Sequence, residues 1–231
     1  MKDYIESRFG SSLDGIDVVQ PIYHSPGFKL PDHLCILGDE PDNIQYVKWG
    51  LVPYWVKDEA HANKIRFQTL NARSETIFNK PSFRVPIKKN RCLVLIDGFF
   101  EFREVNGKKF PYLIRLKSED AFALAGIWDT WGNTRTFSII TTEANPLMEM
   151  IHNTKKRMPV ILPRKLERHW IEPDITNEEL KEMMVPYDEN DMKAHPVSRD
   201  LSKRGIDTNV SEILTERSYP ELQVTSLDMF L

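Results

Sequence analysis

Two short glycine-containing turns constrain the fold of this chain more than any other feature of its sequence. They are Asn106-Gly107, between residues 99–105 and 110–116, and Gly132-Asn133, between residues 121–131 and 134–142. Asn and Gly accept the left-handed backbone conformations of a primed two-residue turn, which joins neighbouring antiparallel strands. The sequence therefore predicts two β-hairpins rather than an alternation of strands and helices.

Further strands and helices are expected on both sides of these hairpins. Strands are predicted at residues 33–37, 44–50 and 91–97, and helices at residues 2–10, 71–78, 145–152, 163–171 and 176–184. Asn145 and Pro146 are typical of a helix N-cap and first turn. The expected class is α+β: one domain, residues 1–231, with a mostly antiparallel, twisted, barrel-like sheet and helices packed outside it.

Composition excludes several classes of protein. The chain has 231 residues, of which 41% are hydrophobic, so it can bury a core. Its longest apolar segments are too short to cross a bilayer, and residues 1–10 lack the apolar centre of a signal peptide. We therefore expect a cytoplasmic protein with no membrane partner.

The two cysteines, Cys35 and Cys92, lie within apolar segments. This placement suits a reducing compartment and argues against a disulfide framework or a thiolate metal site. Cys92 lies inside a predicted strand, with no helix N-terminus to lower its pKa, which indicates a buried structural thiol rather than a nucleophile. We expect neither a metal nor a cofactor.

Charge is unevenly distributed along the chain, although the formal net charge is only -3. Residues 64–91 carry eight basic side chains and a single acid, Glu75, and residues 152–168 carry six basic side chains and one acid. Residues 171–200 instead carry nine acids and three basic side chains. Basic segments of this kind suit phosphate binding, but a solvated surface without function has the same pattern.

Glu101 is an acid inside a predicted strand that is otherwise rich in phenylalanine. Alternation along residues 99–105 places Phe99 and Glu101 on one face of that strand. A carboxyl group beside an aromatic ring loses hydration, which raises its pKa toward the range of a general acid or base. The alternative is an ion pair with Arg103 or with a partner on a neighbouring strand.

Two other polar positions are compatible with either chemistry or helix capping. His152 closes the predicted helix 145–152, where the helix dipole favours an imidazolium that carries protons, but a histidine there is also an ordinary cap. Asn71, Arg73 and Ser74 could together orient a polar substrate and hold a phosphate. Asn71 or Ser74 equally suits the start of a helix.

Aromatic side chains are dense around Pro53. Trp49, Tyr54 and Trp55 surround this proline, which ends a predicted strand. Their rings could be exposed for stacking on bases, or they could belong to the core.

Six segments, taken in order, resemble signature blocks of the SRAP family, the SOS response-associated peptidase proteins. They are WGLVPYW (49–55), NARSET (71–76), RCLVLIDGFFEF (91–102), SIITTEAN (138–145), IHNTKKRMPVIL (151–162) and HPVS (195–198). The resemblance implies the SRAP fold and a sensor of abasic sites in single-stranded DNA, with replication-associated proteins as further partners to consider. A binding module without chemistry, and a peptidase limited to its own N-terminal residue, are the alternatives.

The resemblance also implies a covalent mechanism, in which an N-terminal cysteine captures the ring-opened sugar of the lesion as a thiazolidine crosslink. By motif match, Glu101 would donate and accept protons, His152 would assist the Schiff-base chemistry, and Asn71 would orient the lesion. The DNA contacts implied in the same way are Trp49, Trp55, Arg73, Arg84, Thr142 and Arg157.

This sequence departs from the family pattern at its second residue, where Lys2 stands in place of the cysteine. Methionine is removed only before small residues, so the chain as written exposes no N-terminal cysteine and is expected to form no heat-stable crosslink. We expect a truncated start, or otherwise a variant that binds without crosslinking. In both cases Glu101, His152 and Asn71 should surround one pocket that faces the amino terminus.

Overall fold

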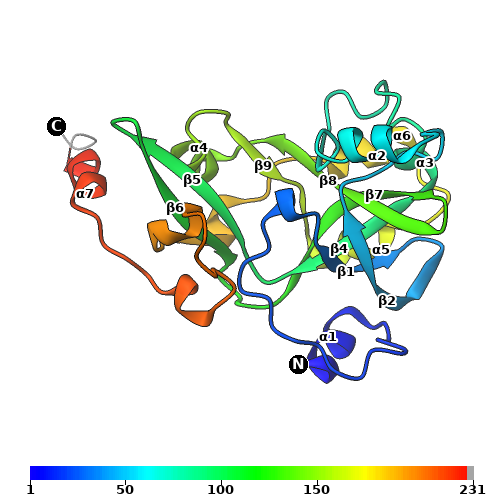
Figure 1. Cartoon of the computed structure of the whole chain (residues 1–231), viewed down its shortest axis with the longest axis horizontal. Helices are drawn as coiled ribbons and strands as arrows, with labels where there is room; N and C mark the ends of the chain where they lie inside the picture. Colours follow the sequence, from blue (N-terminus) through cyan, green and yellow to red (C-terminus); the bar gives the residue numbers. More distant parts are fainter. Residues whose placement is uncertain (228–231) are drawn as a thin grey trace.

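The computed structural model describes residues 1–227 (Figure 1). Its α-helices are α1 (Lys2–Phe9), α2 (Glu59–Ile65), α3 (Pro86–Lys89), α4 (Pro146–Ile151), α5 (Arg164–Trp170), α6 (Asn177–Met183) and α7 (Pro220–Leu227). Its strands are β1 (Asp32–Leu37), β2 (Glu40–Trp49), β3 (Asn71–Arg73), β4 (Arg91–Ile96), β5 (Phe99–Val105), β6 (Lys108–Leu116), β7 (Phe122–Trp131), β8 (Thr134–Glu143), β9 (Arg157–Pro159), β10 (Ile161–Leu162) and β11 (Met192–Pro196). The short 3-10 helices are η1 (Gly27–Lys29), η2 (Glu189–Asp191), η3 (Arg199–Ser202) and η4 (Ser211–Leu214).

An eight-stranded sheet forms the larger part of the molecule. Its strands run in the order β10-β7-β4-β1-β2-β8-β3, β9 pairs with β8, and a direct pairing of β7 with β8 closes the sheet into a barrel. Most neighbours are antiparallel, but β8 runs parallel to both β2 and β3. The predicted α+β class with a barrel-like core is confirmed, and these parallel pairs are an addition to it.

A three-stranded antiparallel sheet, β11-β6-β5, lies beside the barrel (Figure 1). The two predicted hairpins are confirmed, and they belong to different sheets: β5–β6 to the smaller one and β7–β8 to the barrel. The turns have left-handed residues where the sequence predicts them, with φ of 50° at Asn106, 73° at Gly107 and 59° at Gly132. Because β5 is an edge strand, its outer edge is open to contact with α4.

Four of the predicted helices are present as α1, α4, α5 and α6. Asn145 caps α4 as expected, since its side-chain oxygen accepts a hydrogen bond from the Met148 N–H at 2.9 Å. The predicted helix 71–78 is wrong, because its first residues form β3 and turns follow. β3 pairs in parallel with residues 139–141 of β8, and this tertiary pairing overrides the local helix signal. Among the described residues, no helix has the length and apolar character needed to cross a membrane.

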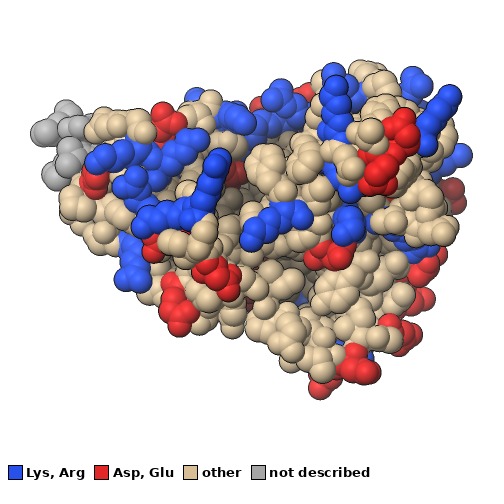
Figure 2. Space-filling view, viewed as in Figure 1, with Lys and Arg blue, Asp and Glu red and all other residues tan. Residues whose placement is uncertain are grey.

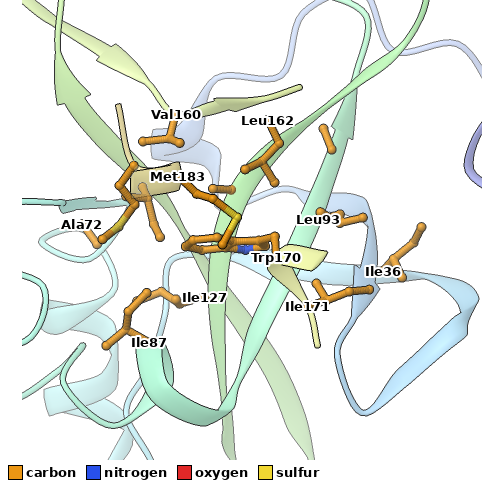
Figure 3. Close-up of a cluster of buried hydrophobic side chains, with 14 of the residues drawn as sticks. Ile36, Ala72, Ile87, Leu93, Ile127, Val160, Leu162, Trp170, Ile171 and Met183 are labelled. Atoms are coloured by element: carbon orange, nitrogen blue, oxygen red, sulfur yellow. The ribbon is translucent and has the colours of Figure 1, made fainter. Parts of the chain in front are cut away.

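Trp170 of α5 lies at the centre of the main hydrophobic cluster (Figure 3). It is fully buried, and its indole N–H donates to the carbonyl oxygens of Cys92 and Gly126. A second cluster joins the barrel to the three-stranded sheet and contains Met148 and both cysteines. Cys35 and Cys92 are free and buried, as predicted. This second cluster holds α4 against β5 and so positions the candidate site.

Candidate functional site

Glu101 lies in the middle of β5, on the face that packs against the second hydrophobic cluster. It pairs across the ladder with Tyr112 of β6, and Phe99 precedes it by two residues on the same face. The Glu101 side chain is 26% exposed. Burial raises the pKa of this carboxyl above its ordinary value, against the opposing effects of His152, a backbone hydrogen bond and Lys155. The predicted desolvated setting of Glu101 is confirmed.

His152 faces Glu101 from the end of α4. Its Nδ1 lies 3.6 Å from the Glu101 Oε1 and 2.9 Å from the Arg157 carbonyl oxygen. Because a carbonyl oxygen can only accept, Nδ1 carries a proton, and the neutral imidazole therefore keeps its lone pair on Nε2. The two side chains form an acid–base pair that can deliver one proton and take up another.

Asn153 ties the end of α4 to the outer edge of β5. Its side-chain amide donates to the Glu104 carbonyl oxygen at 2.8 Å, and its side-chain oxygen accepts from the Glu104 N–H at 3.1 Å. The carboxamide therefore pairs with β5 as one residue of an added strand would. This contact fixes His152, the preceding residue, beside Glu101.

Arg157, the first residue of β9, connects His152 to the barrel. Its carbonyl oxygen accepts the His152 Nδ1–H, and its guanidinium forms a two-point ion pair with Glu75. The same guanidinium donates to the Thr141 carbonyl oxygen at 2.7 Å. The hydrogen bond from Arg157 holds the pKa of Glu75 below its ordinary value. The sequence predicts that Arg157 contacts DNA. In the structure its guanidinium is instead paired with the Glu75 carboxylate.

Asn71 and Arg73 share one face of the eight-stranded sheet with this network. In β3 they pair with Ile139 and Thr141 of β8, and paired residues point to the same side of a sheet. Both side chains are exposed. The structure therefore brings Asn71 to the predicted side of the molecule, but within the described residues no hydrogen bond joins it to Glu101 or His152.

Two of the residues predicted to contact DNA have buried or partly buried side chains. Trp49 is partly buried and stacks on Phe137 with ring centroids 6.1 Å apart, which places it in a wall. Thr142 is only 4% exposed, and its hydroxyl donates to the Met184 carbonyl oxygen at 3.1 Å. In this conformation Thr142 does not reach a bound strand. Its neighbour Thr141 occupies the face on which the site lies.

Trp55 and Arg84, two of the predicted DNA contacts, lie close together at the surface. Together with Tyr54, Pro81 and Val85 they line a hollow of about 370 Å³. Tyr54 is 63% and Trp55 38% exposed, so both rings are accessible to a flat ligand. In the view of Figure 2, Lys and Arg side chains are spread over much of the upper half, with a group of Asp and Glu side chains among them at the upper right and others along the lower edges.

The amino terminus lies away from these residues. In Figure 1, α1 is at the lower edge of the molecule, whereas α4 and β9 are at the upper edge. Arg8 of α1 forms a buried ion pair with Glu167 of α5 at 2.7 Å, and the Lys2 ammonium donates to the carbonyl oxygens of Leu13 and Ile16. The expectation that the candidate site faces the amino terminus is therefore wrong.

Sequence reasoning assigned no role in the site to Glu75, Thr141 or Asn153. Glu75 is the single acid in the basic segment 64–91, and this contrast could have indicated that it pairs with a basic side chain. Thr141 and Asn153 carry no such signal, because their roles come from contacts between distant strands. Across residues 1–227, no three His, Cys, Asp or Glu side chains come together in a way that could hold a metal ion.

Comparison with known proteins relates this site to a family. The model of the SOS response associated peptidase (SRAP) family matches residues 17–204, which include every candidate site residue. Abasic site processing protein YoaM of Bacillus subtilis is 41% identical over 209 residues, which cover 83% of this chain and 88% of that protein. Abasic site processing protein HMCES of Gallus gallus is 30% identical over 203 residues, which cover 76% of this chain and 58% of that protein.

The fold agrees with the sequence match. An X-ray crystal structure of a protein from Bacteroides thetaiotaomicron is 38% identical and superimposes with a TM-score of 0.88, over 94% of this chain and 96% of that one. The family match includes the strands and the helix that position Glu101 and His152. This chain therefore belongs to the SOS response associated peptidase family.

Proposed function

We propose that this protein binds abasic sites in single-stranded DNA and opens the sugar ring of the lesion by acid–base catalysis. The names of its relatives suggest the lesion. The observation that carries the chemistry is the Glu101–His152 pair, 3.6 Å apart and partly buried. The two groups lie within reach of one small ligand.

The sugar of an abasic site is a cyclic hemiacetal, and its opening needs two proton transfers. One proton is delivered to the ring oxygen, another leaves the C1′ hydroxyl, and the bond from C1′ to the ring oxygen breaks. The products are an aldehyde at C1′ and a hydroxyl at C4′, with no net change in atoms. A paired acid and base at one site is the arrangement that this reaction requires.

Glu101 and His152 have complementary protonation states for these steps. Because burial raises the pKa of Glu101, this carboxyl stays protonated to a higher pH than an exposed one and can donate to the ring oxygen. His152 keeps Nε2 as the acceptor, because the Arg157 carbonyl oxygen holds the proton on Nδ1. After ring opening Glu101 is a carboxylate and His152 an imidazolium; the carboxylate takes one proton from solvent and Nε2 releases one to solvent, which restores the starting states.

The strand on either side of the lesion would contact exposed basic and aromatic groups. Arg73, Arg84 and Lys155 are exposed and suit phosphates, and Tyr54 and Trp55 suit unstacked bases. Contacts of this kind read no base edges, so we expect little sequence preference.

Fluorescence anisotropy with a labelled single strand tests the ligand. The strand containing one abasic site should bind more tightly than the same strand without the lesion, and affinity should fall as salt is added. An aminooxy probe, which reacts only with the open aldehyde, then measures ring opening on the bound strand. Glu101→Gln should slow oxime formation and leave binding nearly unchanged. Equal affinity for the two strands would contradict the proposed ligand, and an unchanged rate in the variant would contradict the role of Glu101.

A further inference from the structure

Phe28 has the most exposed large hydrophobic side chain that the structure describes, with 77% of its surface accessible. It lies in η1, on the loop that leads into β1. We propose that Phe28 stacks on a base next to the abasic site and is a binding residue for the flanking strand. This inference rests on the proposed function and adds a contact to it.

The loop is attached to β5 on one side of the candidate site. The His24 ring contacts Phe100 edge to face, with centroids 5.4 Å apart and planes at 84°. His24 Nδ1 is also 2.7 Å from the Thr208 hydroxyl oxygen, which holds the imidazole against the strand. Phe100 is the residue before Glu101. The Phe100 side chain lies on the face of β5 opposite to Glu101, so the loop contacts the strand that carries the proposed proton donor from its other face.

The same loop is attached to the barrel on the other side. The Gly27 backbone lies so close to the Trp49 ring that a Cβ added at Gly27 would come within 3.0 Å of it. Trp49 in turn donates its indole N–H to the Leu70 carbonyl oxygen at 2.8 Å, and Leu70 precedes Asn71. Phe28 follows Gly27 directly, so it lies on a loop that contacts β5 through His24 and Trp49 of β2 through Gly27.

The backbone around Phe28 is held in one conformation. The Lys29 N–H donates to the Pro26 carbonyl oxygen, and the Leu30 N–H donates to the Gly27 carbonyl oxygen, both at 2.9 Å. These bonds form a turn that ends with Leu30 at a φ of 51°. A ring carried on a fixed turn loses little freedom when a ligand covers it, which favours binding.

A base beside an abasic site is the ligand that fits this ring. Loss of one base removes a stacking neighbour, so the adjacent base has an open aromatic face. Phe28 offers a flat apolar surface, and Lys29 beside it suits the strand's phosphates. The face of the molecule is hollowed between the three-stranded sheet and the barrel, with Lys and Arg along both sides (Figure 2), which suits a single strand better than an uncharged partner.

The experiment compares Phe28→Ala and Phe28→Trp with the wild type, using anisotropy with the abasic single strand over a range of salt concentrations. Removing one base–aromatic stack should weaken binding by about 5- to 150-fold without changing the salt dependence. Phe28→Trp should keep wild-type affinity or exceed it. Tyr46→Ala is the matched control, because Tyr46 is an aromatic residue of β2 with 42% exposure, and it should bind as the wild type does.

Photocrosslinking locates the contact directly. A strand with 5-iododeoxyuridine next to the abasic site should crosslink to Phe28, identified by mass spectrometry of the peptides. Wild-type affinity in Phe28→Ala, together with crosslinks elsewhere, would overturn the inference and leave the proposed function standing. A wild type that does not prefer the abasic strand would overturn both. If Phe28→Ala changes only self-association of the protein, the ring serves a protein contact and the inference is wrong.

Discussion

Replacing Asn153 by alanine tests whether the contact between α4 and β5 sets the geometry of the proposed acid–base pair. The substitution removes two hydrogen bonds to Glu104, of 2.8 and 3.1 Å. A hydrogen bond contributes a net of about 0.5–1.5 kcal/mol to folding. Both Glu104 groups lie at an exposed edge and can turn to water, so the free energy of unfolding should fall by about 1 kcal/mol rather than by the full sum. Urea denaturation measures this loss.

The effect on ring opening should be larger than the effect on stability. Without the Asn153 contact, the end of α4 is free to move, and His152 loses its fixed distance of 3.6 Å from Glu101. A displacement of about 1 Å lowers the rate of a positioned reaction by about 100-fold. Oxime formation on the bound abasic strand should therefore slow by about 10- to 100-fold, whereas the affinity for that strand should change by less than about threefold because no proposed DNA contact is removed.

Asn153→Asp is the control for this prediction. The carboxylate keeps an acceptor for the Glu104 N–H but loses the donor to the Glu104 carbonyl oxygen, so its rate should lie between those of wild type and Asn153→Ala. If Asn153→Ala loses stability but opens the sugar at the normal rate, the contact stabilises the fold and does not set the geometry of the acid–base pair. If it loses affinity and rate in the same proportion, Asn153 acts on binding, and the argument from geometry is refuted.

Three further predictions concern charged groups. Because burial raises the Glu101 pKa, ring opening should decline as pH rises through that pKa, and Glu101→Gln should abolish this limb of the pH–rate profile. Glu75→Gln should free the Arg157 guanidinium for a phosphate and steepen the slope of log affinity against log salt by about 0.7; an unchanged slope in anisotropy titrations would mean that Arg157 stays shielded. Glu167→Gln leaves Arg8 buried without its partner and should lower the free energy of unfolding by about 3–5 kcal/mol, measured in urea, with no change in the rate of oxime formation by the folded protein.

The parts of the fold that local chemistry determines could be predicted from the sequence. The two hairpins depend on neighbouring turn residues, and Asn106 and Gly107 have the conformations that these residue types favour. The helix expected at 71–78 is a strand, because its partner β8 lies far along the chain. The strands β9 and β10 have three and two residues, too few to show any alternation of apolar and polar side chains.

In the candidate site too, local sequence patterns could predict some residues, whereas contacts between distant segments determine the others. The setting of Glu101 could be predicted, because alternation within a single strand places it beside phenylalanine. The choice between Thr141 and Thr142 could not, because a shift of one residue exchanges the two faces of a strand and only the pairing with β3 and β9 fixes which threonine faces the site. The role of Asn153 could not be predicted either, because its partner Glu104 is known only when α4 and β5 are placed together.

The proposed site is a property of the junction between the two sheets. The three-stranded sheet supplies Glu101, and the barrel supplies the Arg157 carbonyl oxygen that sets the His152 tautomer. His152 and Asn153 form the link, because the imidazole bonds to β9 while the adjacent carboxamide bonds to β5. The distance between acid and base therefore depends on how the sheets pack through the second hydrophobic cluster, in which Met148 of α4 is fully buried. A change in that packing would alter proton transfer without touching either reacting group.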